Sequence, residues 1–267
     1  MDRTRIAELL DPFLSAVPIR CHSEQGQRPG EACPERSRRE PAVLSATQLQ
    51  DISTYIDILL HWNARINLTA IRNEEEIVTR HFGESLFAAR LLFPKENHRE
   101  GRDFISGIAL SEGSAPKSGD DAPTKKGASS PAVADLGSGA GFPGLPIKLW
   151  APGIFLTLIE SNQKKAAFLR EVAHALTLTD INIQNARAEE LNPSQTFDLV
   201  TLRAVERFAA VLPTAARLVA RGGQLALLIG SSQVDEAKVV LPEFAWRPEI
   251  PIPCSKARTL LVGRREP

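Results

Sequence analysis

Residues 133–144 read Val-Ala-Asp-Leu-Gly-Ser-Gly-Ala-Gly-Phe-Pro-Gly. The stretch begins as a short apolar strand, reaches Asp135 and then places four glycines within eight residues. Glycine lets the backbone turn at positive φ, and it lets a ligand lie against the chain without a Cβ in the way. The N–H groups that open the next helix are free to bind such a ligand. The stretch therefore predicts a loop that cradles a nucleotide.

From Ala132 onward, strand and helix patterns alternate along the chain. Strands are expected near 132–136, 154–160, 181–184, 197–201 and 223–229, with helices between them. Two more strands, near 244–252 and 258–264, are expected to run antiparallel. Such alternation predicts an α/β fold with a doubly wound, mostly parallel sheet, here of seven strands.

The N-terminal part has helical periodicity instead. Apolar residues recur at helical spacing in 45–60 and in 74–93, and a shorter helix is expected near 6–14. Ser45 or Thr47 can cap the helix that starts there. We expect residues 1–94 to form a helical cap over the sheet.

Two segments interrupt this pattern. Residues 21–41 contain no Leu, Ile, Val or Phe, and residues 95–131 are rich in Gly, Ser, Pro, Asp and Lys. Segments of this composition cannot offset the entropy lost on ordering, so both are expected to be flexible inserts. The predicted division is thus 1–94, 95–131 and a ligand-binding domain at 132–267.

The overall charge is balanced, with 32 basic and 32 acidic residues among 267. A neutral chain does not bind nucleic acid or anionic membrane through bulk charge, so any RNA site must be a local patch. Three scattered cysteines fit neither a disulfide framework nor a metal site. Because no run of about 18 apolar residues occurs, we expect a soluble, cytoplasmic protein without membrane contact. We also expect a monomer.

Three strand ends converge on the predicted loop. In doubly wound sheets the ligand lies across the carboxyl ends of the strands, where Gly137 and Gly139 are placed. Glu160, after the second strand, can accept both hydroxyls of a ribose, and Asp135 can reach a cationic or amino group of the same ligand. After the third strand, the small Ala188 leaves room for an adenine, and Glu189 can meet its amino edge.

The loop also satisfies the dinucleotide fingerprint, with Glu160 about twenty residues on. S-adenosylmethionine is favoured over NAD because Asp135 precedes the first glycine by two residues and Ala188-Glu189 closes the adenine end. A tight turn without a ligand is the remaining interpretation.

Five runs carry a more specific resemblance. They are Trp62-Asn-Ala-Arg-Ile-Asn-Leu-Thr-Ala-Ile71, Arg80-His-Phe-Gly-Glu-Ser-Leu86, Asp135-Leu-Gly-Ser-Gly-Ala-Gly-Phe-Pro-Gly144, Glu160-Ser-Asn-Gln-Lys-Lys-Ala-Ala-Phe-Leu169 and Thr201-Leu-Arg-Ala-Val205. In sequence and order they resemble the RsmG family, also called glucose-inhibited division protein B. The resemblance covers about 45–94 and 131–230.

The resemblance implies a Rossmann-like, class I S-adenosylmethionine-dependent methyltransferase that acts on N7 of a guanine in 16S ribosomal RNA. It implies cofactor contacts at Gly137, Phe142, Ala188, Glu189 and Arg203. Both inserts depart from the family pattern. So does Ile229, because the family often has Lys before the glycine that follows the fifth strand.

Few catalytic groups are expected. Methyl transfer is an in-line displacement that mainly requires the acceptor to be held in place, and guanine N7 offers a lone pair and no proton to lose. No cysteine follows the fourth strand, so a covalent route is not supported. Arg203 is the candidate positioning residue, through a carboxylate of the cofactor, a substrate phosphate or a surface ion pair.

Other residues are candidates for holding the RNA substrate. They are Asn67, Arg80, His81, Lys164 and Lys165. The alternative roles are helix capping for Asn67, core packing for His81 and an ordinary solvated helix face for the two lysines. The expected partner is 16S ribosomal RNA within the small subunit or an assembly intermediate. An NAD-linked oxidoreductase and a non-catalytic cofactor- or RNA-binding module remain the alternative functions.

Overall fold

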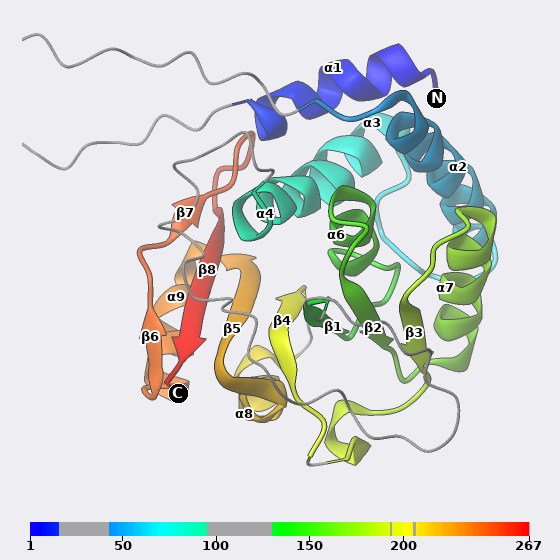
Figure 1. Ribbon diagram of the computed structural model, residues 1–267. Helices are drawn as coiled ribbons and strands as arrows, with labels where there is room; N and C mark the ends of the chain where they lie inside the picture. The colour runs from blue at the N-terminus through cyan, green and yellow to red at the C-terminus, as the bar shows by residue number, and fades with distance from the viewer. Residues whose placement is uncertain (16–42, 95–129, 193, 205–206, 267) are drawn as a thin grey trace, which may run out of the picture.

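The computed structural model describes residues 1–15, 43–94, 130–192, 194–204 and 207–266 (Figure 1). The expected insert at 21–41 lies outside these residues, and so does the insert at 95–131 apart from its last two positions.

A single mixed sheet forms the centre of the described chain. Its strands are β1 (Ala132–Leu136), β2 (Phe155–Ile159), β3 (Ile181–Gln184), β4 (Phe197–Arg203), β5 (Val219–Gly230), β6 (Phe244–Trp246), β7 (Ile250–Pro251) and β8 (Arg258–Arg265). The strand order is β3-β2-β1-β4-β5-β8-β6, with β7 paired to β8. Strands β1 to β5 are parallel, whereas β8 runs antiparallel to β5, β6 and β7. The doubly wound fold is therefore confirmed.

The sheet has one more strand in the described residues than the seven predicted. The strand expected over 244–252 is divided into β6 and β7. Pro248 lies between them, and proline has no N–H to donate to a strand ladder, which explains the interruption.

The N-terminal helices are α1 (Arg3–Leu14), α2 (Ala46–Asn63), the short α3 (Glu74–Glu76), the π-helix η1 (Ile77–Gly83) and α4 (Glu84–Leu92). Ser45 caps α2 through a reciprocal pair of bonds with Gln48. A single helix was expected over 74–93, but its middle widens into η1. Gly83 lies there so close to Phe13 of α1 that a Cβ would come within 2.6 Å of the ring.

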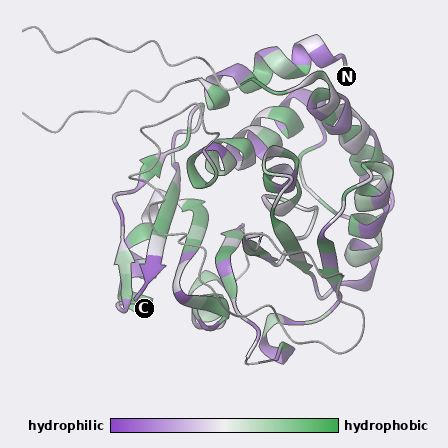
Figure 2. Cartoon of the chain, in the orientation of Figure 1, coloured by the Kyte–Doolittle hydropathy of each residue, from purple (hydrophilic) through white to green (hydrophobic). Residues whose placement is uncertain are grey.

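Helices cover both faces of the sheet. The chain after β1 forms α6 (Gly144–Trp150), and α7 (Gln163–Ala175), η3 (Ala188–Glu190), α8 (Phe208–Leu218), η4 (Ser231–Gln233) and α9 (Val234–Val240) follow in order. On one face α6 and α7 pack together with α1, α2 and α4, and on the other α8 and α9 pack. Figure 2 shows the strands as largely hydrophobic, while α1 and α2 carry hydrophilic residues on their outer sides.

Alternate residues of the strands serve the two faces. Val133 and Leu158 belong to the core shared with the N-terminal helices, and Ala134 and Ile159 belong to the core under α8. The N-terminal helices thus share a hydrophobic core with the sheet. In the part of the chain that the structure describes, no helix is long and apolar enough to cross a membrane.

Candidate active site

The glycine loop joins β1 to α6 at the carboxyl edge of the sheet. Its Gly137, Gly139 and Gly141 have φ values of 69°, 55° and 85°, which glycine adopts without strain. The N–H groups of Gly137 and Ser138 both donate to the carbonyl of Ile159, at 2.9 and 3.1 Å. These bonds fix the loop against the end of β2.

Two acidic residues hold the same loop from the ends of β1 and β2. The Oδ2 atom of Asp135 accepts the N–H of Gly144, and its Oδ1 accepts the hydroxyl of Thr201 on β4 at 2.9 Å. Glu160 accepts the N–H of Gly139 at 2.8 Å and that of Asn162 at 2.7 Å. Both carboxylates therefore bind loop backbone, a role that the sequence did not reveal.

Burial changes the acidity of Asp135. Its side chain is 1 % exposed, and this loss of solvent raises the pKa of the carboxyl to about 6. The hydrogen bonds from Thr201, Gly144 and Ser138, together with the positive charge of Arg203, act in the opposite direction and limit the rise.

A hollow of about 440 Å³ lies beside the loop. It is lined by residues from the ends of β1 and β2, the β3–η3 connection and the start of α8, namely Leu136, Gly137, Ile159, Ser161, Ala186, Arg187, Ala188, Glu189, Arg207, Ala210 and Val211. Three predicted cofactor residues, Gly137, Ala188 and Glu189, therefore line one hollow. Its volume is in the range typical of small-molecule sites.

Two residues that the sequence analysis did not select hold the backbone around this hollow in place. The Asn185 amide donates to the carbonyls of Glu160 and Ser161. Arg217 of α8 donates to the carbonyls of Ala188 and Leu191. Both side chains bond to backbone far away in the sequence, and no local pattern marks such a role.

The helical part contacts the glycine loop directly. The buried hydroxyl of Tyr55, on α2, donates to the carbonyl of Ala140. The ring of Phe142 stacks on Tyr55 at 5.3 Å and on His81 at 4.7 Å, and it meets Phe82 edge-on. The Phe142 side chain thus lies in the core under the N-terminal helices, and only its backbone is left to face a ligand.

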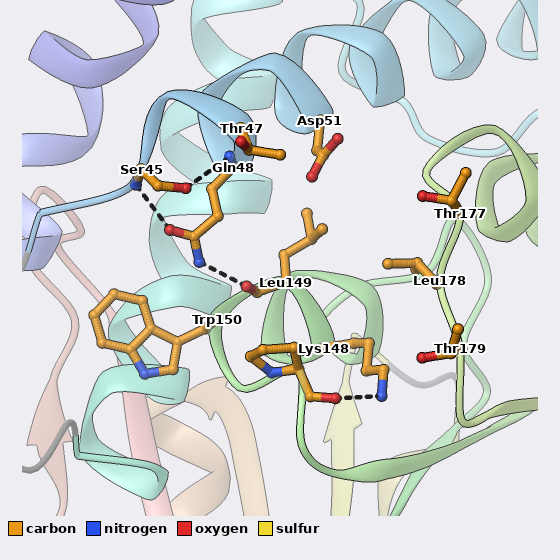
Figure 3. A pocket seen from close by; sticks show the side chains of 11 residues that line it. Ser45, Thr47, Gln48, Asp51, Lys148, Leu149, Trp150, Thr177, Leu178 and Thr179 are labelled. Atoms are coloured by element: carbon orange, nitrogen blue, oxygen red, sulfur yellow. Dashed lines mark hydrogen bonds between the residues drawn. The ribbon is translucent and has the colours of Figure 1, made fainter.

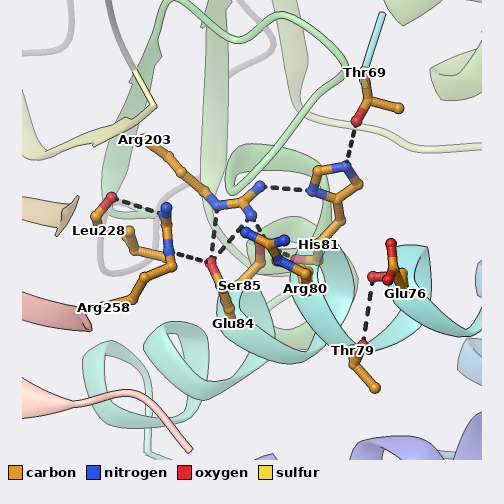
Figure 4. A network of polar contacts seen from close by, with 10 residues as sticks. All are labelled: Thr69, Glu76, Thr79, Arg80, His81, Glu84, Ser85, Arg203, Leu228 and Arg258. Carbon is orange, nitrogen blue, oxygen red and sulfur yellow. Dashed lines mark hydrogen bonds and ion pairs between the residues drawn. The ribbon is translucent and has the colours of Figure 1, made fainter. Parts of the chain in front are cut away.

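Arg203, at the end of β4, points toward the helical part (Figure 4). Its guanidinium binds the carboxylate of Glu84 at 3.1 Å, the Nδ1 atom of His81 at 3.0 Å and the carbonyl of Arg80. The Arg203 side chain is only 8 % exposed and the Glu84 side chain 3 %, so this is a buried ion pair rather than a surface one. Arg203 does not line the hollow beside the loop.

His81 is held as a neutral ring. Burial, followed by the charges of Arg203, Arg80 and Arg258, lowers the pKa of its imidazole to about 3. Because Arg203 can only donate, Nδ1 must accept, and Nε2 carries the proton. The Nε2–H group donates to the Thr69 hydroxyl oxygen, with 2.7 Å between the nitrogen and the oxygen. In this geometry His81 is a buried residue whose two ring nitrogens are both hydrogen-bonded within the protein.

The remaining candidates lie on the surface. Asn67 is exposed, and Asn63 instead binds the loop backbone, through the N–H groups of Leu68 and Thr69. Arg80 and Lys164 are exposed, and Lys165 is half-buried in the first turn of α7. None of them lines the hollow beside the loop.

A second hollow, of about 480 Å³, lies at the other end of α6 from this loop (Figure 3). It is formed by the start of α2, the end of α6 and the connection from α7 to β3, where β2 and β3 begin rather than end. The Lys148 ammonium beside it is bound to the carbonyls of Pro152 and Ile154. The loop and the strand ends therefore make the hollow of about 440 Å³ the candidate active site.

Comparison with known proteins agrees with this geometry. The family model described as rRNA small subunit methyltransferase G matches residues 48–106 and 122–247. The chain belongs to this family. A ribosomal RNA small subunit methyltransferase G from Roseiflexus castenholzii is 34% identical over 230 aligned residues, and the match covers 82% of this chain and 84% of the relative. One from Xylella fastidiosa is 30% identical over 211 residues, 79% of this chain and 81% of the relative.

A solved structure supports the fold. Magnesium protoporphyrin IX methyltransferase from Synechocystis, with bound S-adenosylmethionine, superposes with a TM-score of 0.54 at 13% identity, over 85% of this chain and 100% of that chain. The fold is thus that of class I methyltransferases. As a member of the methyltransferase G family, the chain is a methyltransferase with S-adenosylmethionine as cofactor. The NAD-linked and non-catalytic alternatives are not favoured.

The residues present fit this cofactor. A Cβ added to Gly139 would meet no atom closer than the carbonyl of Gly137, at 3.7 Å, so this face of the loop is open. Ala186 and Ala188 leave space in the hollow, and the exposed Glu189 supplies an acceptor at its rim. At the position where the methyltransferase G family often has Lys, Ile229 is buried in the core under α8 and offers no polar contact.

Proposed function

We propose that this protein transfers the methyl group of S-adenosylmethionine to N7 of a guanine in 16S ribosomal RNA. The observation that carries the proposal is the open glycine loop beside a hollow lined by Gly137, Ala188 and Glu189, in a chain of the methyltransferase G family. The relatives named above are small-subunit RNA methyltransferases. We also propose a cytoplasmic location, as expected for a protein that acts on ribosomal RNA.

The chain's own residues bind the cofactor and orient it. When bound, S-adenosylmethionine supplies a methyl group on a cationic sulfur. Glu160 keeps the glycine loop against the end of β2, and its remaining lone pairs can accept ribose hydroxyls. Ala188 and Glu189 form the adenine end, and Arg217 holds the backbone there. Asp135 contributes by fixing the first turn of α6 and the end of β4.

No general base is required. Guanine N7 carries an in-plane lone pair and no proton, so the reaction depends on placing that atom in line with the methyl group. His81, the histidine beside Arg203, uses Nδ1 to accept from Arg203 and Nε2 to donate. The absence of a free base among these described contacts agrees with N7 as the acceptor.

The test is methyl transfer from radiolabelled S-adenosylmethionine to 16S ribosomal RNA that lacks the modification, followed by digestion to nucleosides. The expected label is in 7-methylguanosine. Label in another nucleoside, or none, would refute the proposal. Because the chain has no net charge, assembled subunits or assembly intermediates are expected to be better substrates than free RNA.

A further inference from the structure

Three arginines from separate parts of the chain gather around Glu84 (Figure 4). Arg80 lies on η1, one helical turn before Glu84, and Arg203 ends β4. Arg258 begins β8, where its Nε lies 2.9 Å from the same Glu84 oxygen that binds Arg203. We call these four residues the arginine cluster.

The positive charges of the cluster exceed the negative ones. Glu84 is the only carboxylate that forms an ion pair with these arginines among the described residues. His81 adds no charge, since burial and the arginines keep it neutral. Asp135 is close enough for Arg203 to influence its pKa, but it binds Thr201 and Gly144. Even with Asp135 ionised, three cations face two anions.

One arginine of the cluster is left to bind an anion. Arg203 and Arg258 both pair with the Glu84 carboxylate, at 3.1 and 2.9 Å. The Arg80 guanidinium is exposed, and within the described residues it forms no ion pair. The free guanidinium of Arg80, beside two more arginines that share one carboxylate, favours an anion with several acceptor oxygens.

The position of the cluster argues against the cofactor as that anion. None of its four residues lines the hollow beside the glycine loop. The sheet strands whose ends line that hollow are β1 and β2, together with the β3–η3 connection and the start of α8. Arg203 instead ends β4, Arg258 pairs with Gly230 of β5, and Glu84 is on α4. The strand order reverses between β1 and β4, so the cluster lies on the β4–β5 side of this switch point.

We propose that the arginine cluster binds a phosphodiester group of the RNA substrate. Arg80 supplies the exposed guanidinium that contacts phosphate, and Glu84 keeps the guanidiniums of Arg203 and Arg258 side by side behind it. Arginine suits this role because its planar fork can bind two phosphate oxygens at once. The inference rests on the proposed RNA substrate and adds where its backbone is held.

The test measures binding of 16S ribosomal RNA by the full chain and by Arg80→Ala over about 50–200 mM salt. A lost phosphate contact is expected to weaken binding about tenfold and to reduce the slope of log affinity against log salt by about 0.7–0.9. Arg80→Lys keeps the charge and is expected to restore the slope. Arg3→Ala, an exposed arginine on α1, is the matched control and is expected to bind like the wild type.

Calorimetry with S-adenosylmethionine separates the two candidate anions. Its affinity is expected to be the same for Arg80→Ala and wild type. The phosphate site would be overturned if Arg80→Ala kept the wild-type salt slope. It would also be overturned if this variant lost affinity for S-adenosylmethionine and not for the RNA. Wild-type protein that binds the RNA with the steeper slope but transfers no methyl group would contradict the proposed function and still support the phosphate site.

Discussion

At the end of β1, the carboxyl group of Asp135 is buried, and its pKa is raised to about 6 from an ordinary value of 3.8. Between these two values the folded chain holds a proton that the unfolded chain has released. Stability from this group is therefore full below about pH 4 and is lost as the pH rises through about 6.

Asp135→Asn removes this titration. The quantity to compare is the difference in unfolding free energy, wild type minus variant. This difference is expected to fall by on the order of 3 kcal/mol as the pH rises from about 4 to about 7. Urea unfolding at several pH values measures this difference. A difference that stays constant, or that rises with pH, would show that the carboxyl group is not protonated on folding.

Two glycines in the same loop offer a matched pair. A Cβ on Gly141 would lie 2.3 Å from the Tyr55 hydroxyl, whereas one on Gly139 would meet only the Gly137 carbonyl oxygen, at an ordinary contact distance of 3.7 Å. Gly141→Ala is expected to cost at least about 3 kcal/mol of stability, and Gly139→Ala only about 1 kcal/mol for its positive φ. Equal costs in denaturant unfolding would contradict this packing.

At the scale of elements, α2 is coupled to the glycine loop through Tyr55. Tyr55→Phe leaves the Ala140 carbonyl without its donor, so a loss of about 1–3 kcal/mol in stability and weaker S-adenosylmethionine binding are expected. Trp62→Phe is the control, because it deletes an exposed bond of the same helix, to Glu171. Similar cofactor affinity in both variants would show that α2 does not shape the site.

Strand positions were the most predictable elements. The expected ranges 132–136 and 181–184 coincide with β1 and β3. The apolar run of β1 is typical of a buried strand, and the alternation of Ile with polar residues in β3 is typical of a half-buried one. The widening at η1 was not predictable from the helical periodicity of 74–93, and neither was the close packing of Gly83 against Phe13 of α1. A pattern read along one segment does not report such contacts.

The site was predictable in part for the same reason. Gly137, Ala188 and Glu189 follow strands whose ends must meet in a parallel sheet, and they do line one hollow. The ion pair of Arg203 was missed, since Glu84 lies 119 residues away in the sequence. Arg258, which shares the Glu84 carboxylate, comes from the last strand. Only the folded chain brings these residues together.

At the scale of the whole molecule, the N-terminal helices and the sheet share one hydrophobic core. We therefore expect them to unfold together. Trp62 and Trp150 lie against this core, while Trp246 packs on the other one, so tryptophan fluorescence reports on both. Fluorescence and far-ultraviolet circular dichroism are expected to give coincident urea transitions, and two separate transitions would contradict a common core.

The account depends most on the glycine loop as the place where S-adenosylmethionine binds. Calorimetric titration of wild type and Gly139→Ala with S-adenosylmethionine and, separately, with NAD tests this directly. The expected result is micromolar binding of S-adenosylmethionine alone, lost in the variant while its unfolding transition is nearly retained. Binding of NAD by the wild type, or equal binding of S-adenosylmethionine by both proteins, would contradict the account.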